Sequence, residues 1–285
     1  MIDHIKGEPL SSTSALVLLW TDKNLYSTSV VKNYWSKLDL SAGEQLYEEC
    51  NTIWPSYEAV INDRKWLIAD WSNQILASQE MDQVIIFAAG WAPLGLELAE
   101  RYPNYRIYEL DTDFMEAKAK LVSTISNAPK NIRFVTSDIS NHQQCMDSLQ
   151  QDGWNPFKPT LLILEGISYY IKREDLMAVF DLAANQSKAI LEYMVPYDHV
   201  EPSRRDIPIQ VFGIIAKDCH LELPIETWDI EQIRQGVPGT ILERVTLCDI
   251  EKLRSKGVKE DGAIFPTPAS GWIEIANILI EKPQH

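Results

Sequence analysis

The sequence has few cysteines and no long apolar or basic run, and each of these shortages excludes a class of protein. Its 285 residues include four cysteines, with no C-x-x-C pair and no histidine at zinc-finger spacing, so we expect no structural metal. The apolar stretches are much shorter than the ~20 residues that cross a bilayer, so a membrane protein is not expected.

The charge is unbalanced toward acid, with 41 Asp and Glu against 26 Lys and Arg and a formal net charge of -15. No basic run is long enough to follow a phosphate backbone, so nucleic acid is not an expected partner. The opening residues lack the basic region and the cleavage pattern of a secretion signal. Together with the scarcity of cysteine, this indicates a cytoplasmic protein with reduced thiols.

What the sequence does contain is an alternation of helical and strand-like segments. Apolar residues recur at helical spacing from about Ala42 to Leu76, which predicts an all-helical N-terminal lead within residues 1–80. Five β-rich runs then alternate with helical segments, a pattern that predicts a doubly wound α/β fold with a mostly parallel sheet. The runs lie at 84–89, 105–110, 131–136, 159–165 and 188–195.

The chain after Val195 is less regular. A proline-rich stretch and apolar helical segments follow, and we interpret residues 196–235 as a helical lid insertion that covers a binding site. Two further strands at 239–247 and 271–280 would add a final antiparallel hairpin and complete a seven-stranded sheet. Residues 81–285 are thus expected to form the domain that follows the lead.

A tight turn follows the first predicted strand, at the edge where an open α/β sheet binds its ligand. The turn has the sequence F-A-A-G-W-A-P-L-G at residues 87–95. Ala88 and Gly90 are small enough for a ligand to approach the backbone, and Pro93 suits the first turn of a helix. This segment is therefore a candidate nucleotide-binding turn.

Acidic residues end the next two predicted strands. Asp111, or as a second choice Glu109, follows the turn at the distance expected of an acid that accepts the hydroxyl groups of an adenosine ribose. Asp138 could accept a hydrogen bond from an adenine amino group while Ile139 packs on the ring. In both cases the alternative is a helix cap, for a helix that begins near Thr112 or for the one after the third strand.

The glycine pattern separates two kinds of nucleotide. A pyrophosphate needs the G-x-G-x-x-G turn, but Ala88 replaces one glycine here and none follows three residues after Gly90. S-adenosylmethionine has no phosphate and tolerates alanine at that place. The turn therefore favours S-adenosylmethionine over a nicotinamide dinucleotide.

Three motifs between about Asp63 and Val195 resemble the leucine carboxyl methyltransferase family, which includes protein phosphatase carboxyl methyltransferases and bacterial natural-product O-methyltransferases. The family's L-G-A-G-x-D-T turn is similar to F-A-A-G-W-A-P. Its E-x-D is similar to the segment 109–111, with Lys118 at a similar distance beyond. Its E-G-x-x-x-Y-L is similar to E-G-I-S-Y-Y-I at 165–171 and is the most specific match.

The resemblance implies S-adenosylmethionine as cofactor and gives roles to several residues. Arg64 would bind the carboxylate of the methionine part, since its fork of donors suits a carboxylate. Glu165, followed by Gly166, would hold the amino group beside the sulfonium; the alternative is a strand-end carboxylate satisfied by backbone N–H groups. The sequence departs from the family at Ala88, where the family has glycine, and at Ala92, where it has aspartate.

The acceptor side of the site carries fewer signals. Tyr169 and Tyr170 follow the fourth predicted strand and are candidates for the pocket wall. Tyr197, Arg204 and Arg205, in the proline-rich insertion, are candidates for gripping an anionic acceptor.

We therefore predict an S-adenosylmethionine-dependent O-methyltransferase that acts on a carboxylate or hydroxyl of a small molecule, such as a natural product or its precursor. A carboxylate is already ionised and needs no base, whereas a hydroxyl needs one, for which His199 is the first candidate and His220 the second. The alternatives are a protein C-terminal carboxyl methyltransferase, a non-catalytic S-adenosylmethionine-binding protein and a nicotinamide oxidoreductase. The oligomeric state is left open.

Overall fold

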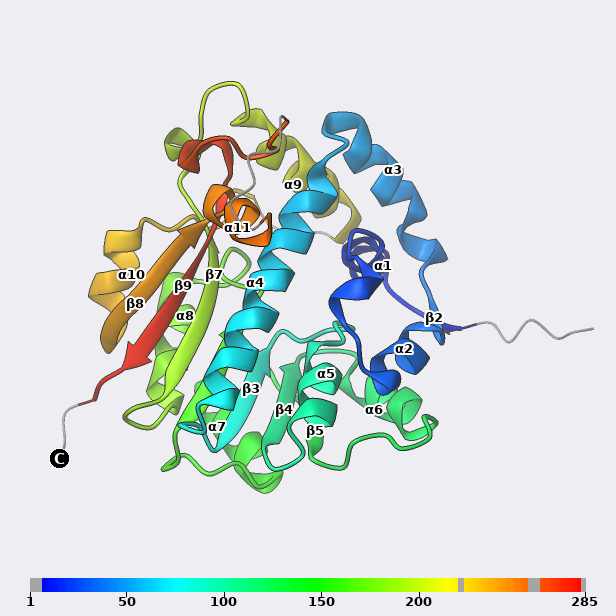
Figure 1. The fold of residues 1–285 in the computed structure, drawn as a ribbon, viewed down its shortest axis with the longest axis vertical. Coiled ribbons are helices and arrows are strands. Elements are labelled where there is room, and N and C mark those ends of the chain that lie inside the picture. The colour runs from blue at the N-terminus through cyan, green and yellow to red at the C-terminus, as the bar shows by residue number, and fades with distance from the viewer. Residues whose placement is uncertain (1–6, 220–222, 256–261, 283–285) are drawn as a thin grey trace, which may run out of the picture.

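The computed structural model describes residues 7–219, 223–255 and 262–282, and its centre is one seven-stranded sheet (Figure 1). The strand order is β5-β4-β3-β6-β7-β9-β8. Strands β3 to β7 run parallel, whereas β9 is antiparallel to both β7 and β8. This confirms the predicted doubly wound, mostly parallel fold. The strands are β3 (Gln83–Phe87), β4 (Arg106–Asp111), β5 (Ile132–Thr136), β6 (Thr160–Leu164), β7 (Lys188–Met194), β8 (Gly239–Thr246) and β9 (Ile273–Ile280).

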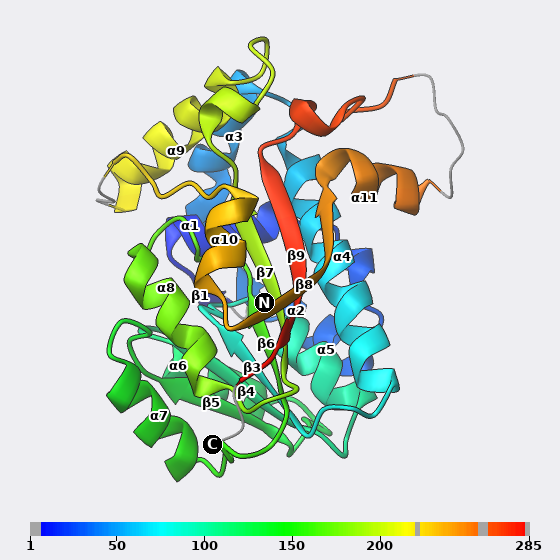
Figure 2. The same ribbon diagram turned by 90° about the vertical axis from the view of Figure 1, so that its left-hand side faces the viewer.

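Helices cover both faces of the sheet, which is why its central strands are apolar (Figure 2). Every residue of β3 and β6 is buried, as expected of parallel strands with helices on both sides. The helix α6 (Met115–Ser123) packs against the edge strand β5. One face carries α4 (Tyr57–Ala77), α5 (Leu94–Arg101) and α11 (Leu247–Arg254), and the other carries α7 (His142–Gln151), α8 (Arg173–Val179) and α10 (Ile230–Gly236).

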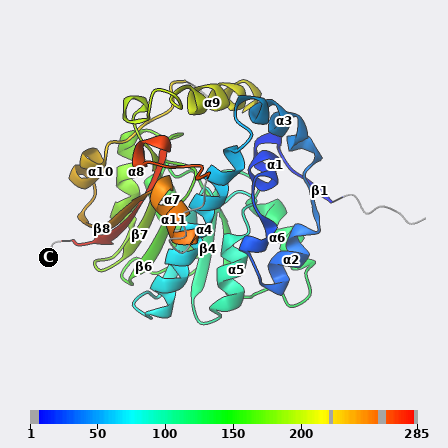
Figure 3. The same cartoon turned by 45° about the horizontal axis from the view of Figure 1, so that its top comes forward.

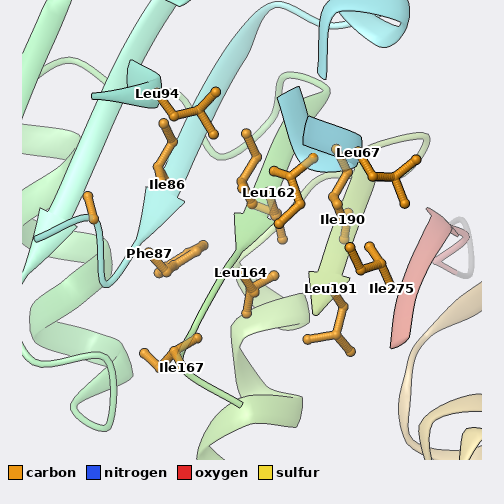
Figure 4. Close-up of a cluster of buried hydrophobic side chains, with 14 of the residues drawn as sticks. Leu67, Ile86, Phe87, Leu94, Leu162, Leu164, Ile167, Ile190, Leu191 and Ile275 are labelled. Carbon is orange, nitrogen blue, oxygen red and sulfur yellow. The ribbon is translucent and has the colours of Figure 1, made fainter. Parts of the chain in front are cut away.

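Aliphatic side chains fill the space between α4, α5 and the sheet (Figure 4). Leu67 of α4 lies over Ile190 and Ile275, and Leu94 of α5 lies over Ile86. All five are buried. Burying one such side chain stabilises the fold by about 1.5–3 kcal/mol. This packing fixes α4 across the sheet, and with it the side chains that α4 presents to the strand ends.

The N-terminal lead contains α1 (Ser12–Leu19), α2 (Ser29–Trp35) and α3 (Glu44–Ile53) before α4. It is not all-helical, because the two-residue strands β1 (Glu8–Pro9) and β2 (Leu38–Asp39) pair in parallel. The prediction was wrong on this point, since pairs this short leave no periodic pattern. The helical segment predicted for 42–76 is also divided, because Pro55 follows α3 and the residue before a proline avoids the helical region.

The chain between β7 and β8 carries α9 (Asp206–Cys219), within the predicted insertion 196–235, and α10, which ends one residue beyond it. α9 packs against α1 and α3, and the three helices lie over the carboxyl ends of the parallel strands (Figure 3). These helices come from opposite halves of the chain. The division into a lead of 1–80 and a domain of 81–285 stays a prediction.

The described residues contain neither a candidate membrane span nor a candidate metal site. No helix in the ranges 7–219, 223–255 and 262–282 is both long and apolar enough to cross a membrane. Within the same ranges, no group of three or more His, Cys, Asp or Glu side chains is arranged to hold a metal ion.

Candidate functional site

The turn after β3 is held in shape by β4 and α6. Ala88 and Gly90 have left-handed backbone conformations, with φ of +49° and +46°. Asp111 Oδ2 accepts a hydrogen bond of 2.8 Å from the backbone N–H of Gly90. Lys118 Nζ donates to the carbonyl oxygens of Gly90 and Ala92 at 2.9 and 2.7 Å. The turn is therefore fixed from both sides, and Ala88 adopts a conformation that costs a non-glycine residue about 1–2 kcal/mol.

The two acids of β4 lie in different surroundings. Glu109 is fully buried, and its Oε2 lies 2.6 Å from Lys118 Nζ. Burial raises the pKa of Glu109, although Lys118 opposes the rise. A Cβ on Gly95 would clash with the carboxylate of Glu109, which explains the glycine in α5. Asp111 is half-buried and lines a cavity, so it is the acid that a ligand meets more readily.

Neither helix-cap alternative at the strand ends holds. α6 begins at Met115 rather than near Thr112, and its N-cap residue Phe114 makes no side-chain cap. Phe114 has φ of +67°, which no right-handed helix accommodates, so the chain turns between Asp111 and Met115. The N-cap of α7 is Asn141, not Asp138.

Buried charged side chains form a cluster where β6 and β7 end, which we call the floor cluster: Arg64, Lys65, Glu165 and Glu192. Arg64 Nη1 donates to Glu192 Oε1 and to the hydroxyl of Tyr169, both at 3.0 Å. Arg64 Nε lies 3.5 Å from Glu165 Oε1, and Lys65 Nζ donates to the same oxygen at 2.7 Å. None of the four charged side chains is more than 10% exposed.

The floor cluster gives its two glutamates different acidities. Burial alone would raise the pKa of Glu165, but Lys65 and Arg64 beside it bring the pKa below its ordinary value. Burial raises the pKa of Glu192 despite the neighbouring Arg64. Glu192 Oε2 also accepts a 2.6 Å hydrogen bond from the backbone N–H of Gly166. Glu165 is thus ionised at neutral pH and able to hold a cation, while Glu192 orients Arg64 and the turn after β6.

A cavity of about 390 Å³ joins the turn, Asp111 and the floor cluster. Its floor is the strand edge. Its roof comes from α1, through Thr13, Ser14 and Val17, and from α9, through Ile215 and Cys219. The arrangement places charged groups at one end and mostly apolar groups at the other. The predicted site residues in its wall are Arg64, Ala88, Gly90, Glu109, Asp111, Glu165, Gly166 and Tyr170.

Three further predicted residues are not in the cavity wall. Tyr169 is buried, and its hydroxyl accepts a hydrogen bond from Arg64, so it helps to orient that side chain. Asp138 is exposed beyond the end of β5, and its Oδ1 accepts from the N–H and hydroxyl of Ser140. Ile139, next to it, is buried.

Both predicted arginines of the insertion are used by the chain itself. Arg204 lies over the ring of Trp54, 5.5 Å from its centroid, and donates to the carbonyl oxygen of Ile264 at 2.6 Å. Arg205 Nη2 donates to the carbonyl oxygen of Val200 at 3.1 Å. Neither is in the cavity wall.

The predicted base and its neighbour also lie outside the cavity wall. His199 is half exposed, and its Nε2 lies 3.8 Å from Asp229 Oδ2. Tyr197 is half-buried in the same short helical turn, Tyr197–His199. The second candidate, His220, lies outside the described residues.

The sequence analysis missed Lys65, Glu192 and the roof. Lys65 follows Arg64 directly, but a lysine in a helix carries no signal of burial. Glu192 lies inside a strand-like run, where a glutamate flanked by apolar residues could have been noticed as a buried acid. The run A-L-V-L-L at 15–19 is a short apolar stretch whose place over the strand ends no local pattern indicates, although it forms most of α1.

The comparisons with known proteins point to one family. The profile of the leucine carboxyl methyltransferase family matches residues 21–184, which confirms the resemblance drawn from the motifs. No curated protein sequence shows significant similarity to the chain.

Two solved structures show the same fold at low sequence identity. A protein of the DUF574 family from Streptomyces avermitilis superposes with a TM-score of 0.65 and 12% identity, covering 95% of this chain and 98% of that one. A candidate methyltransferase from Thermobifida fusca superposes with a TM-score of 0.62 and 15% identity, covering 98% and 97%. At such identities the likeness concerns the fold alone.

Proposed function

Because the chain belongs to the leucine carboxyl methyltransferase family and is an S-adenosylmethionine-dependent methyltransferase, we propose that it methylates a carboxylate or hydroxyl oxygen of a small molecule. The acceptor class that we put forward is a natural product or its precursor. Family membership confirms the predicted cofactor and activity. It favours them over the nicotinamide and non-catalytic alternatives.

The residues of the cavity floor suit this cofactor. Arg64 Nε is buried and makes no hydrogen bond to any described residue, so it is a donor that a carboxylate would satisfy. Glu165 is an ionised acceptor for an ammonium group. The left-handed Gly90 and Gly166 carry no side chains that would fill the space above the strand ends.

In the proposed site, Arg64 and Glu165 hold the methionine part and Asp111 accepts from the ribose hydroxyls. Asp138 and Ile139 stay predictions for the adenine end, since neither lines the cavity. These residues bind and orient; none of them needs to exchange a proton during the reaction.

The observation that carries the proposal is the single cavity that runs from the charged floor to the roof of α1 and α9. Its volume of about 390 Å³ lies within the range of small-molecule sites. Beyond the floor its wall combines Val17, Ile215 and Tyr170 with the hydroxyls of Thr13 and Ser14. An acceptor with an apolar body and one oxygen nucleophile fits such a wall.

When bound, S-adenosylmethionine supplies an electrophilic methyl group on a sulfonium. The chain's part is to align the acceptor oxygen with that group and to exclude water. A carboxylate acceptor then needs no base. For a hydroxyl acceptor, His199 stays the predicted base, and it lies outside the cavity wall in this structure.

The proposal is tested with S-adenosylmethionine that carries a deuterated methyl group. The purified protein is incubated with it and with a cell extract divided into small molecules and proteins, and mass spectrometry locates the label. We expect label in the small-molecule fraction. Mild alkali then removes it from an ester but not from an ether, which separates carboxylate from hydroxyl acceptors.

Label confined to protein C-termini would overturn the proposal and support the alternative, a protein C-terminal carboxyl methyltransferase.

All four cysteines are free thiols, which supports the further proposal that the protein works in the reducing cytoplasm.

A further inference from the structure

Lys65 is a buried cation of the cavity floor to which the proposed function gives no role. Its side chain is 2% exposed, and among the described residues its ion-pair partner is Glu165, at 2.7 Å. Arg64, by contrast, is anchored by Glu192 and Tyr169, each at 3.0 Å. Of the two cations, Lys65 is therefore the one whose partner can change without dismantling the rest of the cluster.

The ammonium group of Lys65 pairs with the same carboxylate that, in the proposed function, holds the cofactor's amino group. Both are ammonium ions, and Glu165 is the acid proposed to hold the cofactor's amino group. In the protein without cofactor, the buried carboxylate of Glu165 needs a cationic partner, because an isolated buried charge is very costly in free energy. Lys65 supplies that pairing through Glu165 Oε1.

The cofactor also brings a new partner for Lys65. Its amino group and its carboxylate are bonded to the same carbon atom, so an amino group at Glu165 places the carboxylate within a few bonds of the same point. The flexible stem of a lysine can follow a movement of this size.

We propose that Lys65 exchanges partners when S-adenosylmethionine binds, leaving Glu165 to the cofactor's amino group and pairing with the cofactor's carboxylate. This inference rests on the placement of Glu165 in the proposed function. Before binding, Arg64 and Lys65 balance Glu165 and Glu192. After the exchange, the cofactor's amino and carboxylate groups and the four charged side chains of the cluster each have an opposite neighbour.

The test compares S-adenosylmethionine with its decarboxylated analogue, which keeps the amino group, in titration calorimetry. Lys65→Met should weaken binding of S-adenosylmethionine about tenfold or more, because a charged hydrogen bond to the carboxylate is lost. It should leave binding of the decarboxylated analogue unchanged or make it tighter, because the competitor for Glu165 has gone. Lys65→Arg should restore binding of S-adenosylmethionine relative to Lys65→Met.

Equal weakening of both ligands by Lys65→Met, or no effect on S-adenosylmethionine, would overturn the exchange. The variant Glu165→Gln separates this failure from a wrong placement of the cofactor. It should weaken both ligands, because both carry the amino group. If it weakens neither, the placement itself is wrong, whatever acceptor the enzyme methylates. Circular dichroism of each variant shows that the compared proteins are folded.

Discussion

The floor and the roof of the cavity are built from different kinds of contact. The floor is a set of ionised side chains that hold one another, with Arg64 bonded to Glu192 and Lys65 bonded to Glu165. The roof is made where α1 meets α9, it carries the apolar Val17 and Ile215, and at its exposed edge Asp218 accepts a hydrogen bond from the hydroxyl of Ser12. The floor is thus fixed by directional contacts and the roof by apolar packing.

This difference indicates that the floor and the roof bind different ligands. Directional contacts between buried charges recognise one arrangement of charged groups, so the floor suits a ligand of constant shape, which is the cofactor. Apolar contacts have no preferred direction, so the roof can adapt to a different acceptor through a few side-chain changes. Substitutions in the floor should therefore affect folding and cofactor affinity, and those in the roof should affect the acceptor.

The largest expected effect is on stability, from Lys118→Met below the floor. The change leaves Glu109 buried without its cation, which should cost about 3–5 kcal/mol of the free energy of unfolding. Urea denaturation measures it. Lys120→Met, exposed on the same helix, is the matched control and should change stability little. A loss below about 1 kcal/mol for Lys118→Met would show that water reaches Glu109.

The next effect is on cofactor affinity, from Arg64→Gln. The loss of the guanidinium should weaken S-adenosylmethionine binding by about 2–3 kcal/mol, because hydrogen bonds to charged groups are worth that much. Calorimetry measures it, with Arg234→Gln as a control on an exposed arginine. If the two variants bind alike, the floor does not hold the methionine carboxylate through Arg64.

A smaller effect is expected in the roof, from Ile215→Ala. Removing part of a buried side chain should raise the KM for the acceptor about tenfold, or ~1.4 kcal/mol, while the KM for S-adenosylmethionine stays within about twofold. Ile209→Ala, on the same helix but 44% exposed, should change neither value. A change confined to the KM for S-adenosylmethionine would contradict the proposal that the roof contacts the acceptor and the floor contacts the cofactor.

The smallest effect should be a gain, from Ala88→Gly. Glycine relieves the left-handed strain of about 1–2 kcal/mol but adds about 0.5–1 kcal/mol of chain entropy, so a net stabilisation of roughly 0.5–1 kcal/mol is expected. Thermal unfolding measures it. Ala92→Gly, where φ is not positive, should destabilise instead. A destabilised Ala88→Gly would mean that packing of the methyl group outweighs the strain.

Contacts within the site were predictable from the sequence only where the contacting residues lie close together along the chain. The ends of β3 and β4 were recognisable because small residues and acids follow apolar runs directly. The pairing of Arg64 with Glu192 joins residues 128 positions apart, and no local pattern indicates it. Helical segments after Val195 were expected from the spacing of apolar residues, and α9 confirms one of them, but its contact with α1 was not expected.

The choice between Glu109 and Asp111 shows the same limit. Both acids end one strand, and spacing from the turn allowed either to face the ligand. The fold placed Lys118 beside Glu109 and left Asp111 half-buried at the cavity. The position of α6, which carries Lys118, therefore favours Asp111 over Glu109 as the acid that faces a ligand, and nothing within β4 itself indicates this.

By itself, the sequence determined the seven strands, their helices and the turn at Ala88 to Gly90, because periodicity and backbone preference act between near neighbours in the chain. Only the tertiary structure decided which charges form the floor and which helices close the roof. Those contacts arise when α4 is packed across the sheet by Leu67 and its aliphatic neighbours, which brings Lys65 to Glu165 from 100 residues away.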